Sequence, residues 1–122
     1  MSLYRSIYET LNGSKQLTDR VTVIRPEVLQ PEDQMPAIII KAISVTGTNS
    51  LQGDTGNLDQ VRYQIDVWSG SIADADEISN IVRKVIQQSD KLKSNFDGRD
   101  TVYNESTNRY GVQSDYLIWV TI

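Results

Sequence analysis

The sequence predicts an α+β fold, in which two helices pack on one face of a mainly antiparallel sheet of four or five strands. Apolar residues recur at helical spacing near the N-terminus and again over residues 73–88, whereas alternating apolar and polar residues mark 58–69 as a strand. The chain has 122 residues and 39% hydrophobic content, which suits one globular core. We therefore expect residues 1–122 to form a single domain.

The first helix is predicted over residues 3–11. Its apolar and aromatic side chains follow the three- and four-residue spacing of one helical face: Leu3, Tyr4, Ile7, Tyr8 and Leu11. Gly13 can end this helix. Residues 16–34 are less regular, and we expect a short strand or turn before Pro26 that leads into a loop around Pro31.

Two strands are expected in the middle of the chain. Residues 37–45 form a β-branched run that is apolar on both faces, which is typical of a strand covered on both sides. Residues 58–69 alternate strictly and give the clearest strand. The segment 46–57 between them holds three glycines among polar residues, so it is predicted to be a long, mobile loop at the tip of a projecting hairpin.

The second helix is predicted over residues 73–88. Ser71 and Asp74 form an S-x-x-D start signal, and Asp76 and Glu77 add negative charge where the helix dipole favours it. After this helix, residues 92–96 are expected to be a short extended piece that ends in a two-residue turn at Asp97-Gly98. Residues 101–104 and 114–122 are predicted to form the last strands.

The composition excludes several kinds of chemistry. The chain has no cysteine and no histidine, so it lacks thiolate and imidazole nucleophiles, bases and zinc ligands. Asp59 and Asp66 are an odd number of positions apart and point to opposite faces of a regular strand, so we expect these carboxylates and Asp54 to be solvated surface groups. The glycines Gly47 and Gly53 have the wrong spacing for a phosphate loop. No catalytic, metal-binding or cofactor-binding residue is predicted.

Charge and hydropathy limit the expected partners. The net charge of −4 opposes binding to a phosphate backbone. Apolar runs such as Ala37–Ile40 and Tyr116–Val120 are far shorter than the roughly 20 residues that cross a bilayer. Residues 1–11 also lack the apolar core of a signal peptide. We expect no specific nucleic-acid binding, no membrane association, and a cytosolic site of synthesis.

The last strand carries apolar side chains on both of its faces. If the helices cover one face of the sheet, an apolar patch is expected on the opposite face: Ile39, Ile43, Trp68, Leu117 and Trp119. Monomers rarely expose such patches, so these residues are the predicted subunit interface. The alternative is that the segment Glu27–Gln34 covers them within one chain.

Five segments resemble the small tail-completion, or head-to-tail joining, proteins of long-tailed bacteriophages. They are Leu3–Leu11, Met35–Ile38, Val61–Trp68, Ala73–Val85 and Tyr116–Val120. The likeness is one of pattern and order along nearly the whole chain. The polar segment from Asp97 to Asn108 departs from the usual pattern of that family.

The resemblance implies a non-enzymatic virion protein, made in the cytoplasm of a bacterial host, that forms a ring, commonly of six copies, between the head connector and the tail tube. Loops of such rings reach toward the lumen or the adjoining ring. In this chain the loop residues would be Asn49, Ser50, Leu51, Gln52, Gly53 and Asp54. Six copies at −4 would carry about −24, which favours passage of DNA without specific binding.

Two other classes of protein stay open on the sequence alone. A cellular, dimeric α+β ligand-binding domain would need a pocket between helices and sheet with converging polar groups, for which only tyrosines such as Tyr63 and Tyr116 are available. An acid–base enzyme would need a perturbed pair of carboxylates, which the spacing of the acidic residues does not supply.

Overall fold

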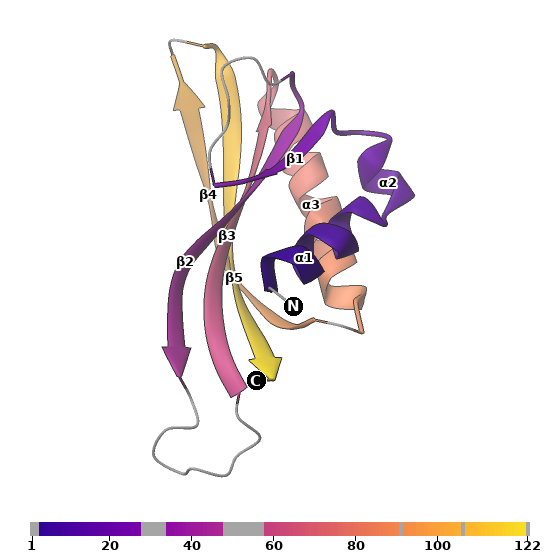
Figure 1. Cartoon of the computed structure of the whole chain (residues 1–122). Coiled ribbons are helices and arrows are strands. Elements are labelled where there is room, and N and C mark those ends of the chain that lie inside the picture. Colours follow the sequence, from indigo (N-terminus) through magenta and orange to yellow (C-terminus); the bar gives the residue numbers. More distant parts are fainter. Residues whose placement is uncertain (1–2, 28–33, 48–57, 91, 106, 122) are drawn as a thin grey trace.

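The computed structural model describes residues 3–27, 34–47, 58–90, 92–105 and 107–121, and Figure 1 shows the arrangement of their helices and strands. The elements in chain order are α1 (Leu3–Asn12), α2 (Lys15–Thr18), β1 (Val23–Pro26), β2 (Ala37–Gly47), β3 (Leu58–Ser69), α3 (Ile72–Gln88), β4 (Lys93–Asn104) and β5 (Arg109–Thr121). The predicted α+β class is confirmed.

The five strands form one sheet in the order β1-β2-β3-β5-β4. Strand β1 runs parallel to β2, and the other three neighbouring pairs are antiparallel. Consecutive strands β2 and β3 pair as far as Gly47 and Asp59. The tip of the predicted projecting hairpin, residues 48–57, lies outside the described residues.

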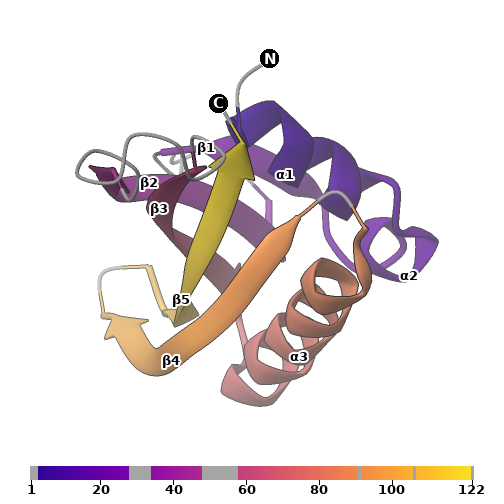
Figure 2. The same cartoon turned by 90° about the horizontal axis from the view of Figure 1, so that it is seen from below.

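All three helices lie on one face of the sheet, as both perpendicular views show (Figures 1 and 2). We call this the inner face. Side chains from α1, α2 and α3 meet alternate side chains of the strands there in one apolar core, which includes Ile7, Leu17, Ile40, Ile78 and Ile118. Each of these five side chains is at most 1% exposed. The helices therefore exclude solvent from the centre of the inner face.

Helix α3 begins as the sequence predicts. The Ser71 hydroxyl accepts a hydrogen bond from the Asp74 backbone N–H, so it caps the first turn. Asp74 also joins the start of α3 to two other elements, because its carboxylate accepts hydrogen bonds from Ser69 Oγ and Arg20 Nη2. Arg20 also donates a hydrogen bond to Glu77, and its hydrogen bonds to Asp74, first, and to Glu77, second, raise the pKa of Arg20. The cluster fixes the segment after α2 against α3.

The structure departs from the sequence predictions in two places. The predicted turn at Asp97-Gly98 is instead a β-bulge inside one continuous strand, β4, where Gly98 has a φ of 132°. Glycine adopts this φ without steric cost, so the strand bends without ending. The four-residue helix α2 was not predicted; Ser14 caps it by accepting a hydrogen bond from the Leu17 backbone N–H. Such short helices carry too little periodicity to be found from sequence.

Candidate assembly surface

The face of the sheet opposite the helices is the candidate functional surface, and we call it the outer face. Because side chains alternate along a strand, the neighbours of the core residues Ile40, Ile65 and Ile118 point to it. The strand register places the following residues on this face: Ile39, Lys41, Arg62, Gln64, Asp66, Trp68, Gly111, Gln113, Asp115, Leu117 and Trp119. Apolar and charged side chains are mixed on it.

Four of the five predicted interface residues lie on the outer face. Trp68, Leu117 and Trp119 are half-buried in the single chain, so part of each side chain remains accessible. Ile39 is 0% exposed and has no free surface of its own. The prediction that residues 37–45 are covered on both sides is confirmed for Ala37–Ile40, which are all buried, and is wrong for Ala42 and Ile43, which are exposed.

Ile43 does not continue the row that Ile39 begins. A bulge between Ala42 and Ser44 shifts the register, so that Ser44 rather than Ile43 stands opposite Arg62. Ile43 is 49% exposed, the largest value among the large hydrophobic residues described as exposed. It therefore remains an accessible apolar side chain at the edge of the sheet, where β2 bends.

The indole of Trp68 lies over a glycine of the neighbouring strand. A Cβ atom at Gly111 would come within 2.9 Å of Trp68 Cζ3 and within 2.9 Å of Val102 Cγ2. Only glycine allows the ring and the backbone to approach so closely. Trp68, Gly111 and Val102 thus form a small apolar cluster on the outer face.

Asp66 overturns the expectation that the acidic residues of this region are solvated. Its side chain is 0% exposed. Oδ1 accepts a hydrogen bond of 2.8 Å from Gln64 Nε2, and Oδ2 lies 3.0 Å from Lys41 Nζ in an ion pair that is not aligned as a hydrogen bond. This burial has no signal in the sequence, because the ammonium group that compensates the charge comes from another strand.

A second ionic group lies nearer the middle of β5. Arg62 Nη1 donates a hydrogen bond of 2.6 Å to Asp97 Oδ2 and lies 3.7 Å from Asp115 Oδ2. The three side chains are between 33% and 42% exposed, so water screens them and each contact adds little stability. They give the outer face a charged band beside the apolar residues.

The described residues hold no cluster of three or more acidic side chains that could bind a metal ion. Tyr63 and Tyr116, the polar groups considered for a ligand site, lie in the core at 6% and 1% exposure. Burial raises the pKa of Tyr63, and the charge of Glu27 adds to the effect. Burial also raises the pKa of Tyr116 to about 12, although Arg99 and Arg83 lower it.

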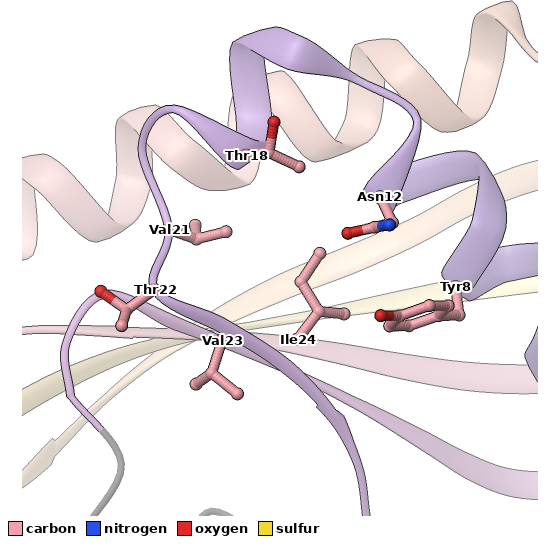
Figure 3. A pocket seen from close by; sticks show the side chains of 7 residues that line it. All are labelled: Tyr8, Asn12, Thr18, Val21, Thr22, Val23 and Ile24. Carbon is pink, nitrogen blue, oxygen red and sulfur yellow. The ribbon is translucent and has the colours of Figure 1, made fainter.

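A shallow pocket of about 320 Å³ lies between α1, α2 and β1 (Figure 3). It is lined by Tyr8, Asn12, Thr18, Val21, Thr22, Val23 and Ile24. None of these side chains is charged, and neither Tyr63 nor Tyr116 is among them. The pocket therefore lacks the converging buried polar groups that a specific ligand site needs.

The helices described here are all too short or too polar to cross a membrane. This finding agrees with the low mean hydropathy of the chain, −0.39.

Comparison with known proteins identifies a family and a shared fold. A family model described as "Tail completion protein gp17" matches residues 5–121. A chain from the solved structure "Virion of native gene transfer agent (GTA) particle" has the same fold, with a TM-score of 0.73 and 16% sequence identity. That alignment covers 99% of this chain and 96% of the other. The search of curated proteins finds no match.

The protein is thus a small α+β protein with the fold of a chain from a virion particle. It belongs to the tail completion protein gp17 family, since the match extends over nearly the whole chain. The resemblance noted in the sequence is confirmed.

Proposed function

We propose that six copies of this chain close into a ring that joins the head connector to the tail tube and completes the tail. The observation that carries the proposal is the family match over residues 5–121. The chain is made in the bacterial host cytoplasm and acts in the virion without catalysis. The absence of cysteine and histidine from the sequence supports a purely structural role.

The outer face supplies a reason for self-association. Trp68, Leu117 and Trp119 keep part of their surface accessible, and Ile43 is half exposed. Removing apolar area from water stabilises an interface by about 25 cal/mol per Å², before the cost of ordering two chains. In the proposed ring, neighbouring copies cover these side chains, and Ile39 supports them from within the sheet.

Contacts between rings are proposed for the segment Asn49, Ser50, Leu51, Gln52, Gly53 and Asp54. These residues connect the ends of β2 and β3, and both strands extend beyond the helices at that end of the molecule (Figure 1). A deletion of Asn49–Thr55 should leave the fold and the ring intact and abolish joining of heads to tails. Infectious, tailed particles made with this deletion would contradict the role of the loop.

DNA passes through the ring in this proposal without being held. Six copies carry a net charge of about −24, and a polyanion gains no counterion-release energy from an acidic ring. Binding of duplex DNA to the assembled ring, measured by fluorescence anisotropy at low salt, should be undetectable. Tight, salt-sensitive binding would contradict this part of the proposal.

The interface is tested by placing charge on the outer face. A Leu117→Glu and Trp119→Glu double variant should stay folded as a monomer and fail to form rings in sedimentation and electron microscopy. The matched control is Ile72→Glu, because Ile72 is also an exposed apolar residue, at 39%, but lies at the start of α3. Rings formed equally well by both variants would remove the outer face from the interface.

The same measurements separate this function from the ligand-binding alternative. A ring-forming protein should sediment as one large species, whereas a cellular ligand-binding domain should give a compact dimer. The uncharged pocket beside α1 makes the second outcome the less favoured one.

A further inference from the structure

Buried polar groups without a hydrogen-bond partner gather in one place beneath α3. Among the described residues, six buried side-chain nitrogen or oxygen atoms have no such partner. Five of them belong to four residues, which we call the polar layer: Ser79 Oγ, Arg99 Nε and Nη2, Ser114 Oγ and the Tyr116 hydroxyl oxygen. Nearly all buried polar groups in folded proteins are hydrogen-bonded, so a cluster of unpartnered ones indicates that a ligand completes their bonding.

The strand register brings the polar layer together on the inner face of the sheet. Arg99 of β4 stands directly opposite Ser114 of β5. Tyr116 follows Ser114 by two positions in β5, so both side chains point to the same face. Ser79 is buried in α3, next to Asn80, to which Arg99 donates a hydrogen bond. The layer therefore lies between α3 and the strands β4 and β5, and Figure 2 shows α3 beside β4.

Arg99 uses only part of its guanidinium for contacts with the described residues. Nη1 donates hydrogen bonds to Asp76 Oδ1 at 3.1 Å and to Asn80 Oδ1 at 2.8 Å. Asp76 and Asn80 are exposed residues of α3, so these bonds lie on the solvent side of the layer. The edge formed by Nε and Nη2 is buried and unpartnered. This edge carries two parallel N–H groups, the arrangement that forms bidentate contacts with anions.

The hydrogen-bonding character of the polar layer favours an anion over a water molecule. The guanidinium nitrogens of Arg99 can only donate, and the hydroxyls of Ser79 and Ser114 can turn their hydrogens toward a shared acceptor. A water molecule has two acceptor positions, fewer than the donors that converge here. An anion accepts hydrogen bonds from several donors at once, so it can satisfy the whole set.

The charges around the polar layer also favour an anion. The carboxylate paired with Arg99 belongs to Asp76, whose side chain is 55% exposed, so water screens this pair. The side chain of Arg99 is only 20% exposed. A second cation is near, because Arg83 Cζ lies 4.0 Å from the centroid of the Phe96 ring, which contacts Tyr116. The positive charge at the buried edge of Arg99 is therefore incompletely compensated.

We propose that a small monovalent anion of the size of chloride binds in the polar layer, held by Arg99 Nε and Nη2 and by the hydroxyls of Ser79 and Ser114. A monoanion suits this buried position, because the cost of removing an ion from water rises steeply with its charge. The bound anion links α3 to β4 and β5. The site lies within one chain, so the inference goes beyond the proposed ring and does not depend on it.

Unfolding of the full chain by urea in two salts tests the site. The protein should be more stable in potassium chloride than in potassium gluconate at equal ionic strength, because gluconate is too large for the layer. A ligand that binds only the folded chain raises the folding equilibrium constant about tenfold at ten times its dissociation constant. The same shift at two protein concentrations would show that assembly does not cause it. Equal stability in the two salts at every concentration would overturn the proposal.

Substitutions in the polar layer should remove the preference for chloride. Ser79→Ala and Ser114→Ala should each reduce the stability difference between the two salts by more than half, because each removes one donor. Ser69→Ala is the matched control: Ser69 is also buried, but its hydroxyl donates to Asp74 outside the layer. If all three alanine variants keep the full difference between the salts, the layer does not bind the anion.

Removal of the cation gives the strongest change. Arg99→Gln should abolish the difference between chloride and gluconate. Lys84→Gln also removes one positive charge, from an exposed position of α3, and should leave the difference unchanged. A chloride effect of wild-type size in Arg99→Gln would refute the role of the guanidinium. The serine variants keep the proposal testable if Arg99→Gln does not fold.

Anomalous X-ray scattering from crystals of the protein soaked in bromide locates the ion directly. A bromide peak is expected within hydrogen-bond distance of Arg99 Nε and Nη2. A water molecule at this position, with no anomalous signal, would overturn the proposal. A bromide peak without any stabilisation by chloride in solution would indicate an adventitious ion only and would count equally against it.

Discussion

On the inner face of the sheet, Ile40, Ile65 and Ile118 lie beneath the helices with at most 1% of their surface exposed. One position away along the same strands, Lys41, Gln64 and Leu117 keep contact with solvent on the outer face. The two faces share one backbone, so the difference comes from their side chains and from the helices that cover only one of them (Figure 2).

Buried side chains are not confined to the inner face. The outer face also holds fully buried groups, Ile39 and Asp66, next to half-buried Trp68. Asp66 is compensated by Lys41 and Gln64 rather than by solvent. The inner face stabilises the fold through apolar packing, whereas the outer face combines packing with ion pairs and keeps part of its apolar surface accessible.

The largest loss of stability is expected from a substitution that leaves a cavity beneath the helices, on the inner face. Ile118→Ala should lower the free energy of unfolding by about 2–5 kcal/mol, because Ile118 is completely buried in the core. Leu117→Ala on the outer face should cost less than half as much, since Leu117 is only half-buried. Urea denaturation of the two variants checks this, and equal losses would mean that the faces are equally well packed.

A smaller loss of stability is expected where the outer face is tightly packed. Gly111→Ala should cost about 1–3 kcal/mol, because the new Cβ would meet Trp68 and Val102 at 2.9 Å. Gly70→Ala is the matched control, as a Cβ there has no neighbour within 4 Å. If chemical denaturation shows the same small change for both glycines, the ring of Trp68 does not lie on Gly111.

The ion pair between Lys41 and Asp66 should contribute still less to the stability of the fold. Lys41→Met removes the cation beside the buried Asp66 and should cost about 1–2 kcal/mol. This is less than the roughly 3–5 kcal/mol for breaking a fully buried pair, because Lys41 is one-third exposed and Asp66 keeps its hydrogen bond from Gln64. Adding Asp66→Asn should recover much of that loss. Unfolding midpoints at neutral pH measure both steps, and a double variant less stable than Lys41→Met would contradict this explanation.

The smallest effect at neutral pH is expected for Tyr116→Phe. The Tyr116 hydroxyl is buried and has no hydrogen-bond partner, so its removal should change stability by less than about 1 kcal/mol or raise it slightly. The ring contact with Phe96, at 5.5 Å between centroids, is kept.

Alkaline pH should separate the wild type from Tyr116→Phe. The pKa of Tyr116 is about 12 in the folded protein and 10.0 for the ordinary side chain, so the unfolded chain releases this proton first. Its contribution is complete below pH 10 and is lost as the pH rises toward 12. The stability difference between the two proteins should therefore shift steadily over this range, and a difference independent of pH would refute the raised pKa.

Much of the fold could be predicted from sequence because its elements are long and periodic. The helix at residues 3–12 and the strand at 58–69 were predicted within one residue of their observed bounds. Short elements carry too few periods for this, as the four-residue helix α2 shows. In β4 the residues Asp97-Gly98 have the composition of a turn, and only pairing with β5 keeps them within a strand.

The candidate surface was predicted in outline but not in detail. Alternation placed Trp68, Leu117 and Trp119 on one face, and the register agrees. The bulge after Ala42 displaced Ile43 from that row, and the burial of Ile39 and Asp66 depends on residues far away in the sequence. The interface itself stays a prediction that the experiments above test.

The sequence by itself determined the α+β class, the long helices and strands, the membership of a phage tail-completion family and the lack of thiol and imidazole chemistry. These properties depend on local periodicity and composition, which a single chain displays directly. Only the tertiary structure decided which charges are buried and where the strands bulge. Those properties depend on strand pairing, which brings together residues that the sequence keeps far apart.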